Sequence, residues 1–511
     1  MTPLAVLHGP LPKVGVLVLA VLAAGALLLP GLRAHAASVL AALVLAPVLL
    51  LGEIWHSPQL SMVHRHPALA AAAGLMVAAL VAGLAWAMLR RRWLVAPLVV
   101  ATLPFRIPIQ AGGKTSNLLV PLYVVVGAGA LAFVLEAFRA PDRERPRPPA
   151  AVVWLERLLA LSVVLYAAQS PYSPDFETAL QQMVFFYVPF TLMFCLLRQV
   201  QWTPRLLRGC LELLVGLALL FAAIGFVEYA TKTIILNSKL VVENDLHTYF
   251  TVNSVFFDPN IFGRFLALVM VALAAVLLYT RRPSRQLALT AALAVLWAGL
   301  VLTLSRSSLG ALLAGLGTLA ALRWRVARTI AIGVAVVAIA AVVLLSLRTT
   351  FGLNQGLNGA SSGRASLTSG GIHMFAQRPV WGWGSGSFVT QYRLEHPGTA
   401  NTIAASHTIA VTIAAEQGAI GELTYIALVL TAAFVLLRGA RGDPSRAAIG
   451  AAFVALILHS NLYADFLEDP VTWTLLGIGA ALAGERLLEA PVRRRSGLAA
   501  EAAGEPQQQL V

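Results

Sequence analysis

The side chains best suited to chemistry in this sequence are arginines placed among apolar segments, and Arg306 is the clearest of them. It lies in LTLSRSSLGALLAGL, at the turn between two apolar runs. An arginine inside a membrane span costs about 2.5–3.5 kcal/mol on insertion scales, so it rarely lies there without a role. Ser305 can cap the following helix, which places Arg306 beside free backbone N–H groups. The pattern predicts an anion site; the alternative is an interfacial arginine that reaches lipid phosphate.

A second group of arginines lies in SSGRASLTSGGIHMFAQRPVWGWGSGSF. Residues 361–363 predict a helix start just before Arg364, and Arg378–Pro379 predict its end. The three glycines within 382–386 predict a flexible turn. Because no strand precedes this turn, a nucleotide-binding fingerprint is excluded. On these residues alone, the alternative is a loop turn with solvated arginines.

His407 and Glu416 belong to the start of a long apolar run, ASHTIAVTIAAEQGAIGELTYIALVL. Glu416 lies about two and a half helical turns deeper than His407. A carboxylate within a membrane span is a functional suspect because its burial is costly. At about 100° per residue the two side chains point to opposite sides of a helix, so we expect no dyad. For His407 the alternative is an ordinary interfacial histidine.

A metal clamp made of acidic residues has little support. Asp258 and Asn260 lie in FTVNSVFFDPNIFGRFLAL, where Pro259 suits a helix N-terminus and Arg264 follows one turn later. A second acidic segment, 459–469, follows the next-to-last apolar run. Neither segment holds a DxD pair of the kind that binds a divalent cation on a phosphate. We therefore predict no metal site.

The composition predicts that lipid surrounds much of the chain. Of 511 residues, 59% are hydrophobic and 12% are charged, with a mean hydropathy of +0.79; soluble chains carry about 25% charged residues. In lipid every backbone amide must pair internally, and the long non-alternating runs favour helices over a barrel. The net charge of +14 comes from Arg and Lys in short loops, so nucleic acid is not a predicted partner. Cys195 and Cys210 flank an Arg-rich loop placed in the cytosol, where no disulfide is expected.

The apolar runs predict an all-α, polytopic transmembrane helix bundle of about 14 spans. The run at 93–104 is too short to cross alone. The runs lie at 14–29, 36–52, 68–89, 93–104, 118–138, 152–168, 181–198, 206–228, 261–280, 286–303, 307–323, 327–346, 409–437, 446–463 and 470–488. The basic loops between them fall on one side, which the positive-inside rule assigns to the cytosol. The long segment 347–407 then faces outward.

The predicted organisation has four parts: N-terminal transmembrane helices in 1–346, an extracytoplasmic loop or lid in 347–407, C-terminal transmembrane helices in 408–490, and a disordered cytoplasmic tail in 491–511. The loop holds several aromatic residues, which favours a small, partly helical lid over an unstructured linker. Its excess of arginine predicts an electropositive surface just above the membrane lipids, where anionic head groups lie.

These motifs resemble the core of the O-antigen ligase and polymerase superfamily of bacterial membrane enzymes. The resemblance rests on SRSSLGALLAGL, then GR followed by RPVWGWGSGSF, then SH with EQGAIGE. The segments FFDPNIFGR and LHSNLYADFLEDPVTW are similar to those of other members. The resemblance is specific over residues 250–480 and rests on topology alone before that.

The resemblance implies a glycosyltransferase of the inner membrane, with its active site on the periplasmic or extracellular side. Its donor would be an undecaprenyl-diphosphate-linked glycan, and its acceptor a glycan or a lipid, with no metal, nucleotide or other cofactor. In such enzymes a buried arginine, a loop arginine and a loop histidine surround the donor diphosphate. These positions carry over to Arg306, Arg364 and His407, the predicted catalytic residues. Four more residues are predicted to contact substrate: Arg264, Arg378, Asn260 and Glu416.

One departure from the family pattern concerns the residue after the histidine. The family usually has Asn there, whereas this chain has Thr408, which puts any role of that amide in doubt. His407 can either accept the acceptor hydroxyl proton or bind phosphate, and the sequence does not choose between these roles.

The main alternative function is a transporter or flippase of a lipid-linked glycan, with the arginines as a transit site. Such a protein should show two related halves. The sequence shows none, and the long late loop has no counterpart in the first half. A structural scaffold leaves Arg306 unexplained. The acceptor, the donor sugar and the choice between ligase and polymerase stay open.

Overall fold

The protein is almost entirely α-helical in the part that its computed structural model describes, which is residues 10–54, 64–111, 114–144, 147–236, 244, 250–324, 364–397 and 406–484. The helices of the first half are α1 (Pro10–Leu28), α2 (Leu32–Ile54), α4 (Pro67–Arg90), η2 (Arg92–Leu94), α5 (Val95–Thr102), α6 (Val120–Arg139), α7 (Ala150–Gln169), α8 (Phe176–Gln182), η3 (Met183–Tyr187), α9 (Val188–Gln199) and α10 (Pro204–Thr231). Those of the second half are α12 (Pro259–Tyr279), α13 (Pro283–Leu302), α14 (Arg306–Arg323), α17 (Arg364–Gln377), α18 (Phe388–Glu395), α19 (Ile409–Leu437), η5 (Ala440–Gly442), α20 (Pro444–Tyr463) and a last helix at 470–484.

Eleven of the described helices are long and apolar enough to cross a membrane, which confirms the predicted polytopic helix bundle. Shorter apolar helices occupy 92–102 and 470–484. The first of these corresponds to the run that was predicted to be too short to cross alone. The predicted span at 327–346 and the tail at 491–511 lie outside the described residues.

Several helix starts combine a capping oxygen with a proline. Asp258 accepts the amide of Asn260 at 2.6 Å, and Pro259 opens α12. Thr203 caps α10 in the same way by accepting the amide of Leu206. Proline suits this position because its missing N–H has no partner within the helix. The capping residue and the proline therefore determine where these helices begin, as the sequence predicts for α12.

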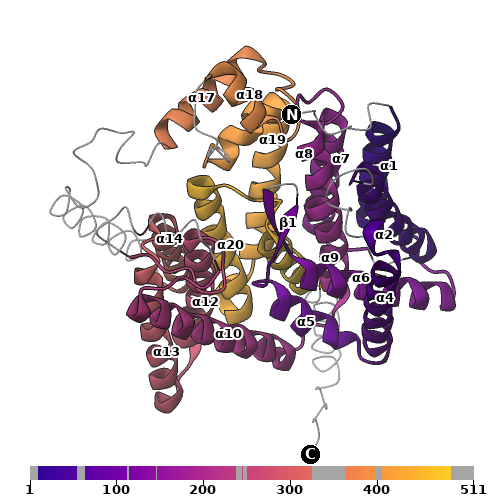
Figure 1. The fold of residues 1–511 in the computed structure, drawn as a ribbon. Helices are drawn as coiled ribbons and strands as arrows, with labels where there is room; N and C mark the ends of the chain where they lie inside the picture. Colours follow the sequence, from indigo (N-terminus) through magenta and orange to yellow (C-terminus); the bar gives the residue numbers. More distant parts are fainter. Residues whose placement is uncertain are drawn as a thin grey trace, which may run out of the picture.

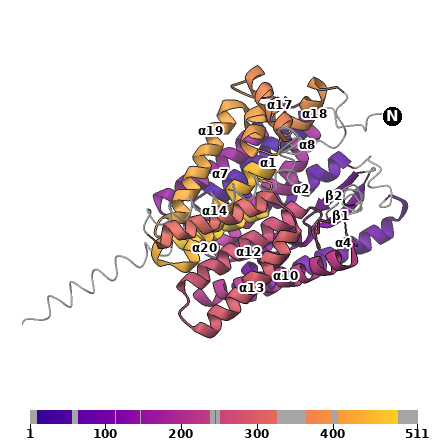
Figure 2. The ribbon, with the colours of Figure 1, turned by 90° about the vertical axis from the view of Figure 1, so that its left-hand side faces the viewer.

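The helices form two groups that meet along α19 and α20 (Figure 1). The first group holds the helices from α1 to α9, which share a core with α19 and the 470–484 helix. The second holds α10, α12, α13, α14 and α20. The short helices α17 and α18 lie together at one end of the bundle, where α17 packs on α19 (Figure 2). The predicted lid is thus a small helical layer in its described part, residues 364–397.

A small β-hairpin is the one departure from the all-α expectation in the described part of the chain. Strands β1 (Ile107–Ala111) and β2 (Lys114–Leu118) pair antiparallel, with Ala111 opposite Lys114. Two residues thus separate the strands, and the sequence there is Gly-Gly, a pair that favours two-residue hairpin turns. The predicted fold did not include this hairpin because the segment is short and its polar residues read as a loop.

Candidate functional site

Arg306 is the first residue of α14 and follows a tight turn from α13. Leu304 in that turn has φ +50°, in the left-handed region. The Ser305 hydroxyl accepts the amide of Ser308 at 3.3 Å, which confirms the predicted cap. Arg306 is exposed, so the burial that the resemblance implied for it is wrong: the first residue of α14 lies at the open end of the helix. The free N–H groups there carry partial positive charge.

A cluster of serines ties this end of α14 to α12 and α20. The Ser305 and Ser307 hydroxyls donate to Asn260 Oδ1 at 2.8 and 3.3 Å. His459 is buried on α20, and its Nε2 lies 3.3 Å from the hydroxyls of both Ser307 and Ser308. The side-chain oxygen of Asn260 therefore accepts hydrogen bonds from α14. These bonds join the N-termini of α12 and α14.

The C-terminus of α20 positions the other two predicted catalytic residues. The Arg364 guanidinium donates to the Leu462 carbonyl at 2.9 Å. His407 Nδ1 lies 3.2 Å from the Tyr463 carbonyl. These carbonyls are among the last of the helix, which have no partner within it. The Tyr463 hydroxyl donates to Asp258 at 2.6 Å, which connects the same residue to the start of α12.

The contact of His407 fixes which of its ring nitrogens can act as a base. A carbonyl oxygen only accepts, so we assign the ring proton to Nδ1, and Nε2 then keeps its lone pair. Burial lowers the pKa of His407, and the nearby Arg364 cation lowers it further. His407 is accordingly neutral near pH 7. Its φ of +58° places it at a sharp turn directly before α19.

Positive charge accumulates on this side of the bundle. Burial lowers the pKa of Arg364; the neighbouring Arg306 cation acts in the same direction, and Tyr463 and Asp258 oppose them. The guanidinium stays protonated because the ordinary pKa of arginine is so high. The N-termini of α12, α14, α17 and α19 all lie at this cluster, and each contributes partial positive charge. An anion bound between Arg306 and Arg364 would relieve their mutual repulsion.

Residues 291–426 match the family model of O-antigen ligase. The matched segment contains Arg306, Arg364 and His407, the three residues that the structure gathers at one end of the bundle. This match confirms the resemblance to the O-antigen ligase and polymerase superfamily over that segment. No curated protein matches it at a significant level. The matched segment thus contributes three residues from separate motifs to one spatial cluster.

Arg264 lies one helical turn beyond Asn260, on the buried face of α12. Its guanidinium forms an ion pair with Asp469 at 3.0 Å, and both side chains are almost fully buried. Arg264 also acts electrostatically on His459 and Tyr463, so it adjoins the cluster from within the membrane-spanning part.

Glu416 is held in a network separate from that cluster. Its carboxylate accepts the amides of Gly386 and Phe388 at 2.8 and 2.9 Å. Its backbone carbonyl accepts the amide of Gly384 at 2.8 Å. The arrangement agrees with the prediction that Glu416 and His407 form no dyad, because the two side chains bind different partners.

The glycine turn at 382–386, which was predicted to be flexible, is buried and closely packed against neighbouring backbone. Gly382, Gly384 and Gly386 all have positive φ and are buried. A side chain at Gly382 would collide with the backbone of Glu416. Arg378, directly before the turn, is exposed and lies 3.9 Å from the centre of the Trp383 ring. Its described contacts do not connect it to Arg306.

Sequence reasoning did not identify Tyr463 as part of the site. The residue acts through its backbone carbonyl and through a hydroxyl that meets Asp258 far away in sequence. The available signal was its place at the end of an apolar run, where a helix leaves its last carbonyls unpaired. The nearby Asp465 carboxyl interacts electrostatically with His407, and burial raises the pKa of Asp465.

Proposed function

We propose that this protein transfers a glycan from an undecaprenyl-diphosphate-linked donor to an acceptor hydroxyl at the outer face of the inner membrane. The observation that supports it best is the convergence of Arg306, Arg364 and a neutral His407 where four helices begin. An anionic diphosphate would meet fixed positive charge there, and a hydroxyl would meet a free base.

In the proposed reaction the acceptor oxygen attacks the anomeric carbon of the donor. The bond from that carbon to the diphosphate oxygen breaks, and undecaprenyl diphosphate leaves with the bonding electron pair. Arg306 and Arg364 stabilise the charge that grows on the leaving oxygens, since a planar guanidinium matches phosphate oxygens bidentately. The hydroxyl proton passes to Nε2 of His407.

The α20 C-terminus keeps these groups in place for the reaction. The Leu462 carbonyl orients Arg364, and the Tyr463 carbonyl holds the Nδ1–H tautomer of His407. Groups held by backbone need no rearrangement when charge develops, which is the condition for strong electrostatic catalysis. We propose that the two guanidiniums provide the positive charge that a metal ion provides in other phosphate sites.

Transfer by the purified protein tests this proposal. A lipid-linked oligosaccharide and an acceptor are mixed with the protein, and the release of undecaprenyl diphosphate is followed together with the glycan product. One lipid diphosphate should appear for each bond formed. If the lipid-linked glycan only crossed the membrane of a vesicle without being cleaved, the transporter function would be correct instead.

The proposed outer-face position has its own test. In a variant that lacks Cys195 and Cys210, a cysteine at Ser366 on α17 should react with an impermeant maleimide added to intact cells. A cysteine at Ser284, at the opposite end of the helices, should stay unlabelled. If only the cysteine at position 284 were labelled, the protein would have the opposite orientation in the membrane.

A further inference from the structure

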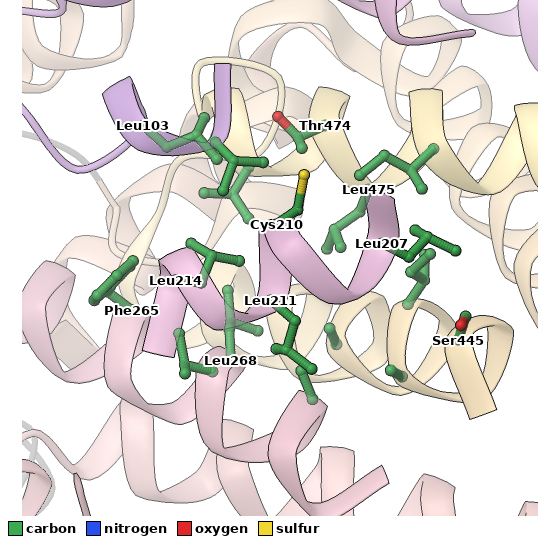
Figure 3. A pocket seen from close by; sticks show the side chains of 18 of the residues that line it. Leu103, Leu207, Cys210, Leu211, Leu214, Phe265, Leu268, Ser445, Thr474 and Leu475 are labelled. Atoms are coloured by element: carbon green, nitrogen blue, oxygen red, sulfur yellow. The ribbon is translucent and has the colours of Figure 1, made fainter. Parts of the chain in front are cut away.

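A long apolar cavity of about 440 Å³ lies beside α12. Its walls come from α5, α10, α12, α20 and the 470–484 helix, with Arg285 of α13 (Pro283–Leu302) at one end. Leucines from α10 and α12 face each other across it (Figure 3). Leu214 lies near Phe265 and Leu211 lies near Leu268, so the two helices run past each other in opposite directions. Such a lining offers little to a polar ligand and much to a hydrocarbon.

The length of this cavity is close to the thickness of a membrane. One face of α12 lines it from Ile261 to Thr280, which spans about 28 Å at 1.5 Å per residue. The hydrocarbon core of a bilayer is about 30 Å thick. An acyl chain of a phospholipid reaches about half of that distance, so it would leave the far half of the cavity empty. A longer chain fills it.

The end of the cavity near Asn260 carries a buried ion pair. Asp469 is the single acidic residue among the lining side chains, and of the four lining arginines Arg208 and Arg285 lie toward the opposite end of the cavity. Asp469 holds Arg264 at 3.0 Å, and its other oxygen accepts the Val471 amide at 3.1 Å. Arg106 lines the same end. An anionic head group would therefore meet excess positive charge where the cavity approaches the proposed active site.

We propose that this cavity binds the chain of a polyprenyl phosphate, and that the lipid phosphate takes Arg264 from Asp469. The inference rests on the proposed function, because the lipid would be the carrier of the donor glycan. A phosphate carries more charge than a carboxylate and can bind a guanidinium bidentately. Asp469 thus acts as an internal substitute that keeps the buried Arg264 paired until the lipid arrives, since an unpaired buried cation is costly.

Binding of undecaprenyl phosphate to the purified full-length protein tests the cavity. Native mass spectrometry is run with this lipid, with farnesyl phosphate and with phosphatidylglycerol. Undecaprenyl phosphate should bind at least about tenfold more tightly than either of the others. Equal affinity for phosphatidylglycerol would identify the cavity as a general lipid site. Equal affinity for farnesyl phosphate would show that the length of the chain does not contribute to binding.

A matched pair of substitutions on α10 sharpens this test. Leu211→Trp fills the cavity beyond Leu214. It should weaken the binding of undecaprenyl phosphate about tenfold, to the affinity of farnesyl phosphate. Leu220→Trp adds the same bulk at a position that is 54% exposed and outside the cavity lining, and should change nothing. Unchanged binding by Leu211→Trp would overturn the proposal. If that variant also transferred glycan normally, the proposed function would stand without the cavity; if wild type bound the lipid but transferred nothing, the function would fail instead.

The exchange at Arg264 is tested by Asp469→Asn. Asparagine can still accept the Val471 amide but no longer competes for the guanidinium with a charge. Affinity for undecaprenyl phosphate should rise about threefold or more. Unchanged or weaker binding by a folded variant would show that Asp469 does not compete with the lipid. Should the variant fail to fold, Arg264→Gln gives the reciprocal result: it should lose affinity for the phosphate but not for farnesol.

Discussion

The cluster around Arg306 and the network around Glu416 were both predicted from charged residues in apolar surroundings, yet the structure treats them differently. The two carboxylate oxygens of Glu416 are satisfied by the protein's own backbone, since they accept the amides of Gly386 and Phe388. Arg306 and Arg364 instead face each other as like charges, beside several helix N-termini. A buried charge that the fold satisfies favours a structural role, whereas like charges gathered at helix ends favour the binding of an anion.

The largest effect is expected at the arginines. Arg306→Ala and Arg364→Ala should each lower transfer by about 100-fold or more, since each removes roughly 3 kcal/mol of charge stabilisation. Arg306→Lys should behave more like alanine than like wild type, because it keeps the charge but loses the planar fork. Initial rates are compared at equal protein levels with a lipid-linked donor.

The matched control is Arg393→Ala, an exposed residue of α18 outside the motifs that contain Arg306 and Arg364. It should stay near the wild-type rate. A rate for Arg306→Ala that equals that of Arg393→Ala would remove the distinction between the cluster and the other loop arginines.

A smaller effect of a different kind is expected at Glu416. Glu416→Gln replaces one acceptor oxygen by a donor opposite the Gly386 or Phe388 amide, which should destabilise the protein by about 1–3 kcal/mol. The rate per folded molecule should change little. Thermal melting in detergent and transfer by the surviving folded fraction are measured together, with exposed Glu177→Gln as the control. A stable variant with a large loss in rate would move Glu416 into the reaction.

The smallest predicted change concerns pH. In the proposed reaction the base is neutral His407, so the rate should fall as pH falls through its pKa, which burial and Arg364 hold below the usual value. Arg364→Gln removes the cation and should move this acidic limb to higher pH, whereas Arg364→Lys should leave it in place. Residual transfer is recorded against pH for both variants. Identical acidic limbs would mean that Arg364 does not act on the group that titrates.

The helix starts that carry the site were predictable because their signals are local. Asp258 and Ser305 cap helices through amides two or three residues away, and a capping residue is visible in sequence. The end of the loop helix at Arg378 followed from the next residue, a proline. Arg306, Arg364 and His407 were assigned to one site by resemblance, and their proximity came only with the fold.

The remaining features depend on contacts between distant segments. A glutamate in an apolar run looks the same whether it awaits a ligand or, like Glu416, receives two amides from a turn some thirty residues earlier. The carbonyls of Leu462 and Tyr463 have no side-chain signature at all. The cavity beside α12 is bounded by several separate helices, so no single segment predicts it.

The central claim, that guanidinium groups supply the charge for glycan transfer, is tested most directly by chelation. Wild type and Arg306→Ala are assayed side by side with a lipid-linked donor, in excess EDTA and then with added magnesium. Wild type should keep its full rate in EDTA, and Arg306→Ala should be slow in both conditions. Loss of wild-type turnover in EDTA, restored by magnesium, would contradict the claim.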